Sequence, residues 1–210
     1  MEELKSKKAG DQFIDYGVAI STAEGERQSG DEYLVHPSAD GVLVALVDGL
    51  GHGYEASQAA RTAVETLKTY AGESVIALVR RCHGALRNTR GAAMSLAFFN
   101  AVDSTITWMG IGNVSGVLIR RDSAVLRRRE ILLIRSGVVG AALPLLRASV
   151  VAVCQADKLI FATDGVAAGF YDGININHPP QEIADRILNT HNKGSDDAMV
   201  LVAQFLEKTT

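Results

Sequence analysis

Hydrophobic residues in this chain form one unbroken run that ends abruptly in an acid and a cluster of glycines. The run spans Val42 to Val47, and Asp48 follows at once, with three glycines within the next five residues. An apolar run bounded by turn residues predicts a strand buried on both faces. From Tyr54 to Leu67 the apolar positions recur at helical spacing. This stretch therefore predicts a strand, an acidic glycine-rich turn and a helix, in that order.

The remaining apolar pattern predicts mostly strands, with two further helices. Short apolar or alternating runs predict strands at 13–21, 33–35, 92–100, 105–110, 116–121, 131–134, 148–153, 159–163 and 199–205. Ser74 fits the N-cap of a second helix, and Pro179 and Pro180 open a third that runs to about His191. The first three strands are expected to form an antiparallel meander. Hairpin-linked strands and grouped helices predict an α+β fold, with antiparallel sheets covered by helices on their outer faces.

The bulk composition narrows the class of protein. The chain has 210 residues, of which 47% are hydrophobic, which suits a single domain over residues 1–210. A formal net charge of −3 predicts no basic face, so no nucleic-acid partner is expected. Without a stretch of the roughly 18–20 apolar residues that a membrane span needs, and without a secretory signal, we expect a cytoplasmic protein with no membrane partner. Cys82 and Cys154 fit core thiols in a reducing compartment.

Acidic residues stand at the ends of four predicted strands. Asp164 ends a strand and precedes a glycine, as Asp48 does, while Asp31 and Asp196 each precede a strand. Because antiparallel neighbours place the start of one strand beside the end of the other, Asp31 should lie near Asp48. Each acid also has an ordinary alternative. Asp-Gly is a common tight-turn dipeptide, Asp31 fits a turn, and Asp196 fits a cap.

Together these acids predict a metal-dependent hydrolase. Four carboxylates and the Gly49 carbonyl suit two hard divalent ions, which take oxygen ligands. Two ions about 3.5–4 Å apart that share a water suit the hydrolysis of phosphate esters. The chain has no CX5R, GXSXG or Rossmann signature, and the glycine-rich segment 136–144 lacks the GK[ST] of a P-loop.

Four motifs resemble those of the metal-dependent PP2C-type serine/threonine phosphatases, in the bacterial branch of sporulation and stress-response phosphatases. They are SGD at 29–31, VALVDGLGHG at 44–53, FATDG at 161–165 and SDDAMVLV at 195–202, in the family's order. The resemblance implies an αββα sandwich and a phosphatase that uses two Mn²⁺ or Mg²⁺ ions. The implied substrates are phosphoserine or phosphothreonine residues of STAS-domain proteins of a stressosome.

By motif position, the resemblance also implies a role for individual residues. Asp48 would bridge both metals, Asp164 and Asp196 would bind one of them, and Asp48 and Asp164 would act in catalysis through metal-bound water. Asp197 takes a neighbouring position that is usually not a direct ligand, so it ranks below Asp196. The expected metal ligands are Asp31, Asp48, Gly49, Asp164 and Asp196.

Two departures from the family pattern concern the phosphate. The arginine that grips phosphate in PP2C enzymes has no clear counterpart; Arg27 is the nearest candidate and is not assigned. The segment between Gly165 and Pro179 is short, which predicts a reduced flap over the site. Two alternatives follow: a catalytically weak PP2C-like module that acts by docking on a partner, and a phosphatase for a small phosphoester. The complete set of acids favours an enzyme, and an open site disfavours a small substrate.

Overall fold

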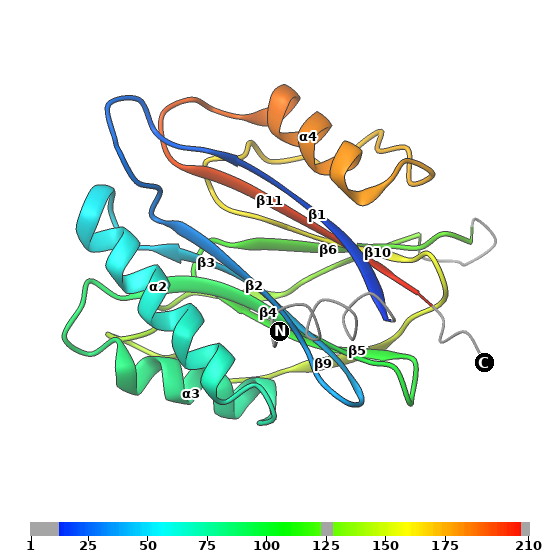
Figure 1. The fold of residues 1–210 in the computed structure, drawn as a ribbon, viewed down its shortest axis with the longest axis horizontal. Coiled ribbons are helices and arrows are strands. Elements are labelled where there is room, and N and C mark those ends of the chain that lie inside the picture. The colour runs from blue at the N-terminus through cyan, green and yellow to red at the C-terminus, as the bar shows by residue number, and fades with distance from the viewer. Residues whose placement is uncertain (1–12, 123–127, 207–210) are drawn as a thin grey trace, which may run out of the picture.

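Two β-sheets pack face to face between helices in the computed structural model, which describes residues 13–122 and 128–206 (Figure 1). Helix α4 (Pro180–His191) covers the outer face of one sheet, and α2 (Gly53–Thr69) and α3 (Val75–Ala85) cover the other. This is the αββα layering that the sequence predicted, so the α+β class is confirmed.

The first sheet joins strands from the two ends of the described chain. Its order is β1 (Ile14–Ser21), β11 (Ala198–Phe205), β10 (Lys158–Ala162), β6 (Ser115–Ile119) and β7 (Arg129–Ile131), and all neighbours are antiparallel. All eight residues of β1 pair with β11. The predicted meander is therefore wrong in its first strand, because the periodicity that identifies a strand does not identify its partner.

The second sheet is built on the apolar run. Its order is β2 (Asp31–Pro37), β3 (Gly41–Gly49), β4 (Ala92–Asn100), β5 (Thr105–Ile111) and β8 (Ile134–Arg135), and β9 (Ser149–Ala152) also pairs with β5. Only the short β5–β8 pairing is parallel among the described strands. The hairpin of β2 and β3, which was the rest of the predicted meander, is antiparallel as expected.

The strand predicted at 131–134 is instead a crossing between the two sheets. Residues 129–131 pair with β6 in the first sheet, whereas residues 134–135 pair with β5 in the second. Leu132 lies at the crossing and is buried in the core between the sheets, while Ile131 and Leu133 are exposed. In the sequence, residues 131–134 are four consecutive apolar residues, which is typical of one buried strand and does not show that the chain changes sheets within them.

Strand β3 is buried on both faces, as predicted. Val42, Val44 and Leu46 enter the core between the sheets, and the alternate residues Leu43, Ala45 and Val47 pack under the helices. Helix α4 and the outer face of the first sheet form a third cluster. These clusters hold the two sheets in fixed positions, so side chains at their strand ends are held in a fixed arrangement.

Local expectations hold in most places. The Ser74 side chain accepts a hydrogen bond from the Ala77 N–H at the start of α3, and Pro180 stands at the start of α4. Both cysteines are free; Cys82 is buried as predicted, but Cys154 is exposed, so its assignment to the core is wrong. None of the described helices combines the length and the apolar character needed to cross a bilayer.

Candidate metal centre

The β2–β3 hairpin places two of the predicted acids directly opposite each other. Asp31 and Asp48 are partners in the strand register, so the predicted proximity is confirmed. The Gly49 N–H donates to the Gly30 carbonyl at 3.0 Å, which continues the ladder past Asp48. Asp31 is only 4% exposed, and Asp48 is half-buried beside it.

Asn113 and Thr163 connect this hairpin to the other sheet. Asn113, in the turn between β5 and β6, donates from Nδ2 to Oδ2 of Asp164 at 2.7 Å, and its side chain also interacts with the Asp48 carboxylate. Thr163 follows β10 and donates its hydroxyl to Oδ2 of Asp31 at 2.8 Å. The ends of strands from both sheets therefore meet at one edge of the sandwich. Neither Asn113 nor Thr163 was among the site residues predicted from the sequence.

The acid pair before β11 divides into an exposed and a buried member. Asp196 is exposed, and its Oδ1 accepts the N–H of Asp197. Asp197 is 4% exposed, and its two carboxylate oxygens accept the N–H groups of Ala23 at 2.8 Å and Gly30 at 2.7 Å. Asp197 thus fastens the 23–30 loop to the edge, whereas Asp196 stands at the rim beside Asp48, whose pKa its charge helps to raise.

Burial and mutual repulsion make the inner carboxyl groups, those of Asp31 and Asp48, difficult to ionise. Burial, followed by the charge of Asp48, raises the pKa of Asp31 to about 8, although the Thr163 hydroxyl opposes the shift. Burial, followed by the charge of Asp164, raises the pKa of Asp48 to about 7, against the Asn113 amide. A divalent cation here would remove this repulsion, because the buried acids would gain a counter-charge.

The donor set fits a hydrated cation rather than one enclosed wholly by protein. Among the residues that the structure describes, no three His, Cys, Asp or Glu side chains lie close enough to surround one ion. Mg²⁺ usually keeps several waters and takes only one or two carboxylates, and octahedral oxygen sites also suit Mn²⁺. Paired acids with elevated pKa values supply such carboxylates, so the residues fit Mg²⁺ or Mn²⁺ held largely through water.

The glycine-rich turn after β3 brings α2 and an arginine side chain to the same edge of the sandwich. A Cβ at Gly49 would lie 2.0 Å from the Ala56 carbonyl oxygen, so α2 sits directly against the end of β3. Gly51 has a φ of +89°, and a Cβ there would lie 2.4 Å from a guanidinium nitrogen of Arg90. Arg90 is therefore the guanidinium that packs on this turn, whereas Arg27 is exposed in the 23–30 loop.

The signals for the missed residues were present but weak. Asn113 follows a glycine at the end of a strand, which is an ordinary turn pattern. Thr163 directly precedes a predicted ligand, and Arg90 lies in a loop between a helix and a strand. Nothing in those local patterns separates a site residue from a turn residue.

Comparison with known proteins gives a consistent set of relatives. A family described as Stage II sporulation protein E (SpoIIE) matches residues 38–206. Phosphoserine phosphatase RsbX of Bacillus subtilis (strain 168) is 30% identical over 95 residues, which cover 45% of this chain and 48% of the relative. The match thus spans about half the length of that relative.

Two solved structures share the fold over nearly the whole chain. One comes from work on the bacterial stressosome as a modular system adapted to control secondary messenger signaling. It has a TM-score of 0.82 at 24% identity, and the match covers 91% of this chain and 99% of that one. The other is RsbX in complex with magnesium, with a TM-score of 0.78 at 23% identity over 92% of this chain and 96% of that one.

Proposed function

This chain belongs to the SpoIIE family of PP2C-type proteins, and from that premise we propose that it is a metal-dependent protein phosphatase. Its substrates are phosphoserine or phosphothreonine residues of STAS-domain proteins in a stressosome. The relative named a phosphoserine phosphatase and the structural neighbour from stressosome work support this choice of substrate. Free thiols at both cysteines suit a reducing compartment, which supports the cytoplasm as its location.

The observation that carries the proposal is the pairing of Asp31 with Asp48, next to Asp164, whose carboxylate accepts a hydrogen bond from Asn113 and whose charge raises the pKa of Asp48. Crowded carboxylates at the end of two sheets cost stability unless a cation joins them. Four carboxylates at one edge are more than the capping of turns or helices requires.

We assign the ion-holding role to Asp31, Asp48, Asp164, Asp196 and the Gly49 carbonyl. Bound Mn²⁺ or Mg²⁺ would lower the pKa of a coordinated water and offset the charge of the phosphoryl oxygens. The RsbX neighbour is described in complex with magnesium, which supports the choice of ion. Asp48, on β3, and Asp164, after β10, would orient the ions from the two sheets. The Asn113 amide fixes the Asp164 carboxylate, and the Thr163 hydroxyl fixes Asp31.

The test measures hydrolysis by the purified protein. We expect release of phosphate from p-nitrophenyl phosphate and from a phosphorylated STAS-domain protein with Mn²⁺ or Mg²⁺, and loss of both with a chelator. Asp48→Asn should reduce turnover to background, whereas Asp172→Asn, at an exposed acid away from this edge, should not. Equal inactivity of the wild-type and Asp48→Asn proteins on every phosphoprotein would instead favour a binding module.

A further inference from the structure

A groove of about 320 Å³ opens beside the candidate metal centre, between the start of α2 and the loop that precedes β4. It is lined by Tyr54, Glu55, Gln58, Asn88, Thr89 and Arg90. None of these residues was assigned a role in ion binding. All six carry polar groups, and the groove is open to solvent, so an extended peptide could enter it from the side.

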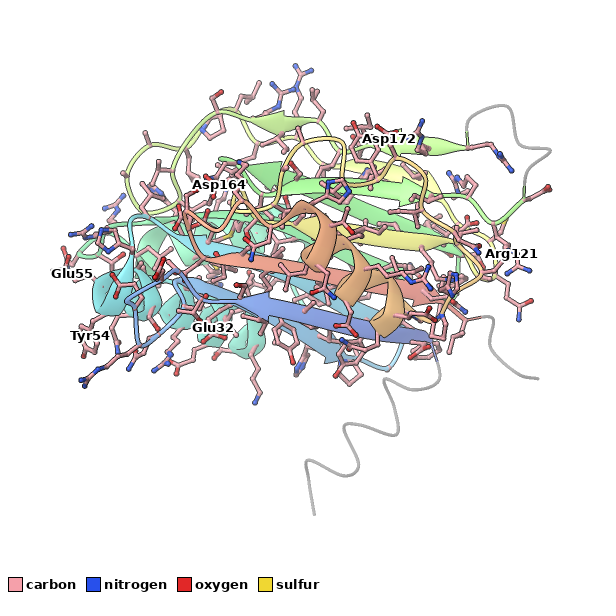
Figure 2. The ribbon with its side chains drawn as sticks, turned by 90° about the horizontal axis from the view of Figure 1, so that it is seen from above. Glu32, Tyr54, Glu55, Arg121, Asp164 and Asp172 are labelled. Atoms are coloured by element: carbon pink, nitrogen blue, oxygen red, sulfur yellow. The ribbon has the colours of Figure 1, made fainter. Side chains whose placement is uncertain are left out.

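The wall of this groove is continuous with the turn that follows Asp48. Gly49 pairs with Ala92 in the β3–β4 register, and the Leu50 N–H donates to the Gly91 carbonyl at 3.0 Å. Figure 2 shows Tyr54 and Glu55 at the same end of the molecule as Asp164, with Arg121 at the opposite end. A chain that places a phosphorylated residue at the metal centre would therefore pass close to the groove.

Tyr54 gives the groove an exposed aromatic wall. Its exposed fraction is 68%, the largest of any described aromatic residue, although it lies in the first turn of a helix whose other face is buried. Tyrosine is enriched at protein interfaces because a rigid ring buries a large area and its hydroxyl stays hydrogen-bonded. A solvated aromatic ring beside a reaction centre is well suited to pack against a substrate side chain.

Arg90 adds a positively charged guanidinium group that can leave its present ion pair and bind a substrate instead. Its ion pair with Glu55 joins two side chains that are 51% and 66% exposed, so the pair contributes little stability. The backbone beneath it is preorganised, because the Thr89 hydroxyl donates to the Leu86 carbonyl and accepts the Gly91 N–H. A guanidinium held in this way can bind a phosphoryl or carboxylate oxygen with two parallel hydrogen bonds.

We propose that this groove binds the segment of the substrate protein next to its phosphoserine or phosphothreonine. An apolar side chain of that segment packs on Tyr54. Arg90 leaves its ion pair with Glu55 and binds a carboxylate or phosphoryl oxygen of the substrate instead. The inference rests on the proposed phosphatase function and adds the surface that selects protein substrates. It would also compensate for the reduced flap that the short segment between Gly165 and Pro179 predicts.

The experiment compares a protein substrate with a small one. For each variant, kcat and KM are measured on a phosphorylated STAS-domain protein and on p-nitrophenyl phosphate. Binding of the phosphoprotein in chelator is measured separately by calorimetry. We expect Tyr54→Ala to raise KM and Kd for the phosphoprotein about tenfold and to leave kinetics on p-nitrophenyl phosphate unchanged. Tyr54→Phe should retain most of the affinity. Tyr70→Ala, the same substitution just after the far end of α2, is the matched control.

The outcomes separate this inference from the proposed function. If the wild-type protein hydrolyses neither substrate, the phosphatase function fails. If both are hydrolysed but Tyr54→Ala matches Tyr70→Ala in KM and Kd for the phosphoprotein, the groove is not a substrate site. If Tyr54→Ala instead abolishes a dimer seen by light scattering, the groove holds a second copy of this chain, and the inference is overturned.

Discussion

At the scale of single residues, Asn113 has more influence than its neutral side chain suggests. It donates to Asp164 and interacts with Asp48, so it orders two carboxylates that belong to different sheets. We expect Asn113→Ala to weaken Mn²⁺ binding about tenfold or more, as is typical when a hydrogen-bond partner of a ligand is lost. Calorimetric titration with Mn²⁺ measures this, with exposed Asn177→Ala as the control. Equal affinities of the two variants would show that Asn113 does not order the ligands.

The inner acids predict an unusual pH dependence of stability. In the unfolded chain Asp31 and Asp48 titrate near 3.8, but in the folded protein the pKa is about 8 for Asp31 and about 7 for Asp48. Between these values the folded state keeps protons that the unfolded state has released. The metal-free protein should therefore lose stability as pH rises from about 4 to about 8.

Urea unfolding in chelator at pH 5, 6, 7 and 8 tests that slope. Asp31→Asn removes the acid with the more strongly raised pKa, so it should flatten the loss and stabilise the metal-free protein most at pH 8. With Mn²⁺ present the trend should weaken or reverse, because metal binds the deprotonated carboxylates. A metal-free protein that is most stable at pH 8 would contradict the raised pKa values.

At the scale of elements, the contact between β3 and α2 positions the rim. A Cβ at Gly49 would overlap the Ala56 carbonyl, so the helix can approach this closely only against a glycine. We expect Gly49→Ala to cost about 1–3 kcal/mol of unfolding free energy, as in other overpacked sites, and to weaken metal binding by shifting the turn. Gly84→Ala in α3 is the control, since nothing lies within 4 Å of its Cβ position and alanine favours a helix. Equal stability of both variants would contradict the close approach.

The strand pairings also show how much of the site could be predicted from the sequence alone. The Asp31–Asp48 pair was predictable because a hairpin fixes which strand end meets which. The proximity of Asp164 to the Asp31–Asp48 pair was harder to derive. Strand β10 reaches the same edge of the sandwich only through its pairing with β6 and β11, which local periodicity does not encode. The pairing of β1 with β11 was missed for the same reason. Their shared position at strand ends grouped the four acids as candidate ligands, and the family motifs implied a role for each of them.

At the scale of the whole molecule, the candidate ions would join the two sheets. Asp31 and Asp48 belong to one sheet, whereas Asp164 and Asp196 stand at strand ends of the other. The hydrogen bond from Thr163 to Asp31 already crosses this boundary, and it is the kind of contact that a bound cation would reinforce. Metal binding should therefore stabilise the sandwich as a unit and not only order the rim.

Thermal unfolding with and without Mn²⁺ measures this coupling. Metal at 100 times its Kd contributes about 2.7 kcal/mol, which should raise Tm by roughly 5–10 °C in a chain of this size. Asp164→Asn should remove much of that rise, because it deletes a ligand from one sheet while leaving the Asp31–Asp48 hairpin in place. Asp172→Asn should retain the full rise, since its carboxylate pairs with Arg129 elsewhere. If Asp164→Asn keeps the full rise, Asp164 does not take part in the stabilising ion site, and Asp31 and Asp48 bind the ion within one sheet.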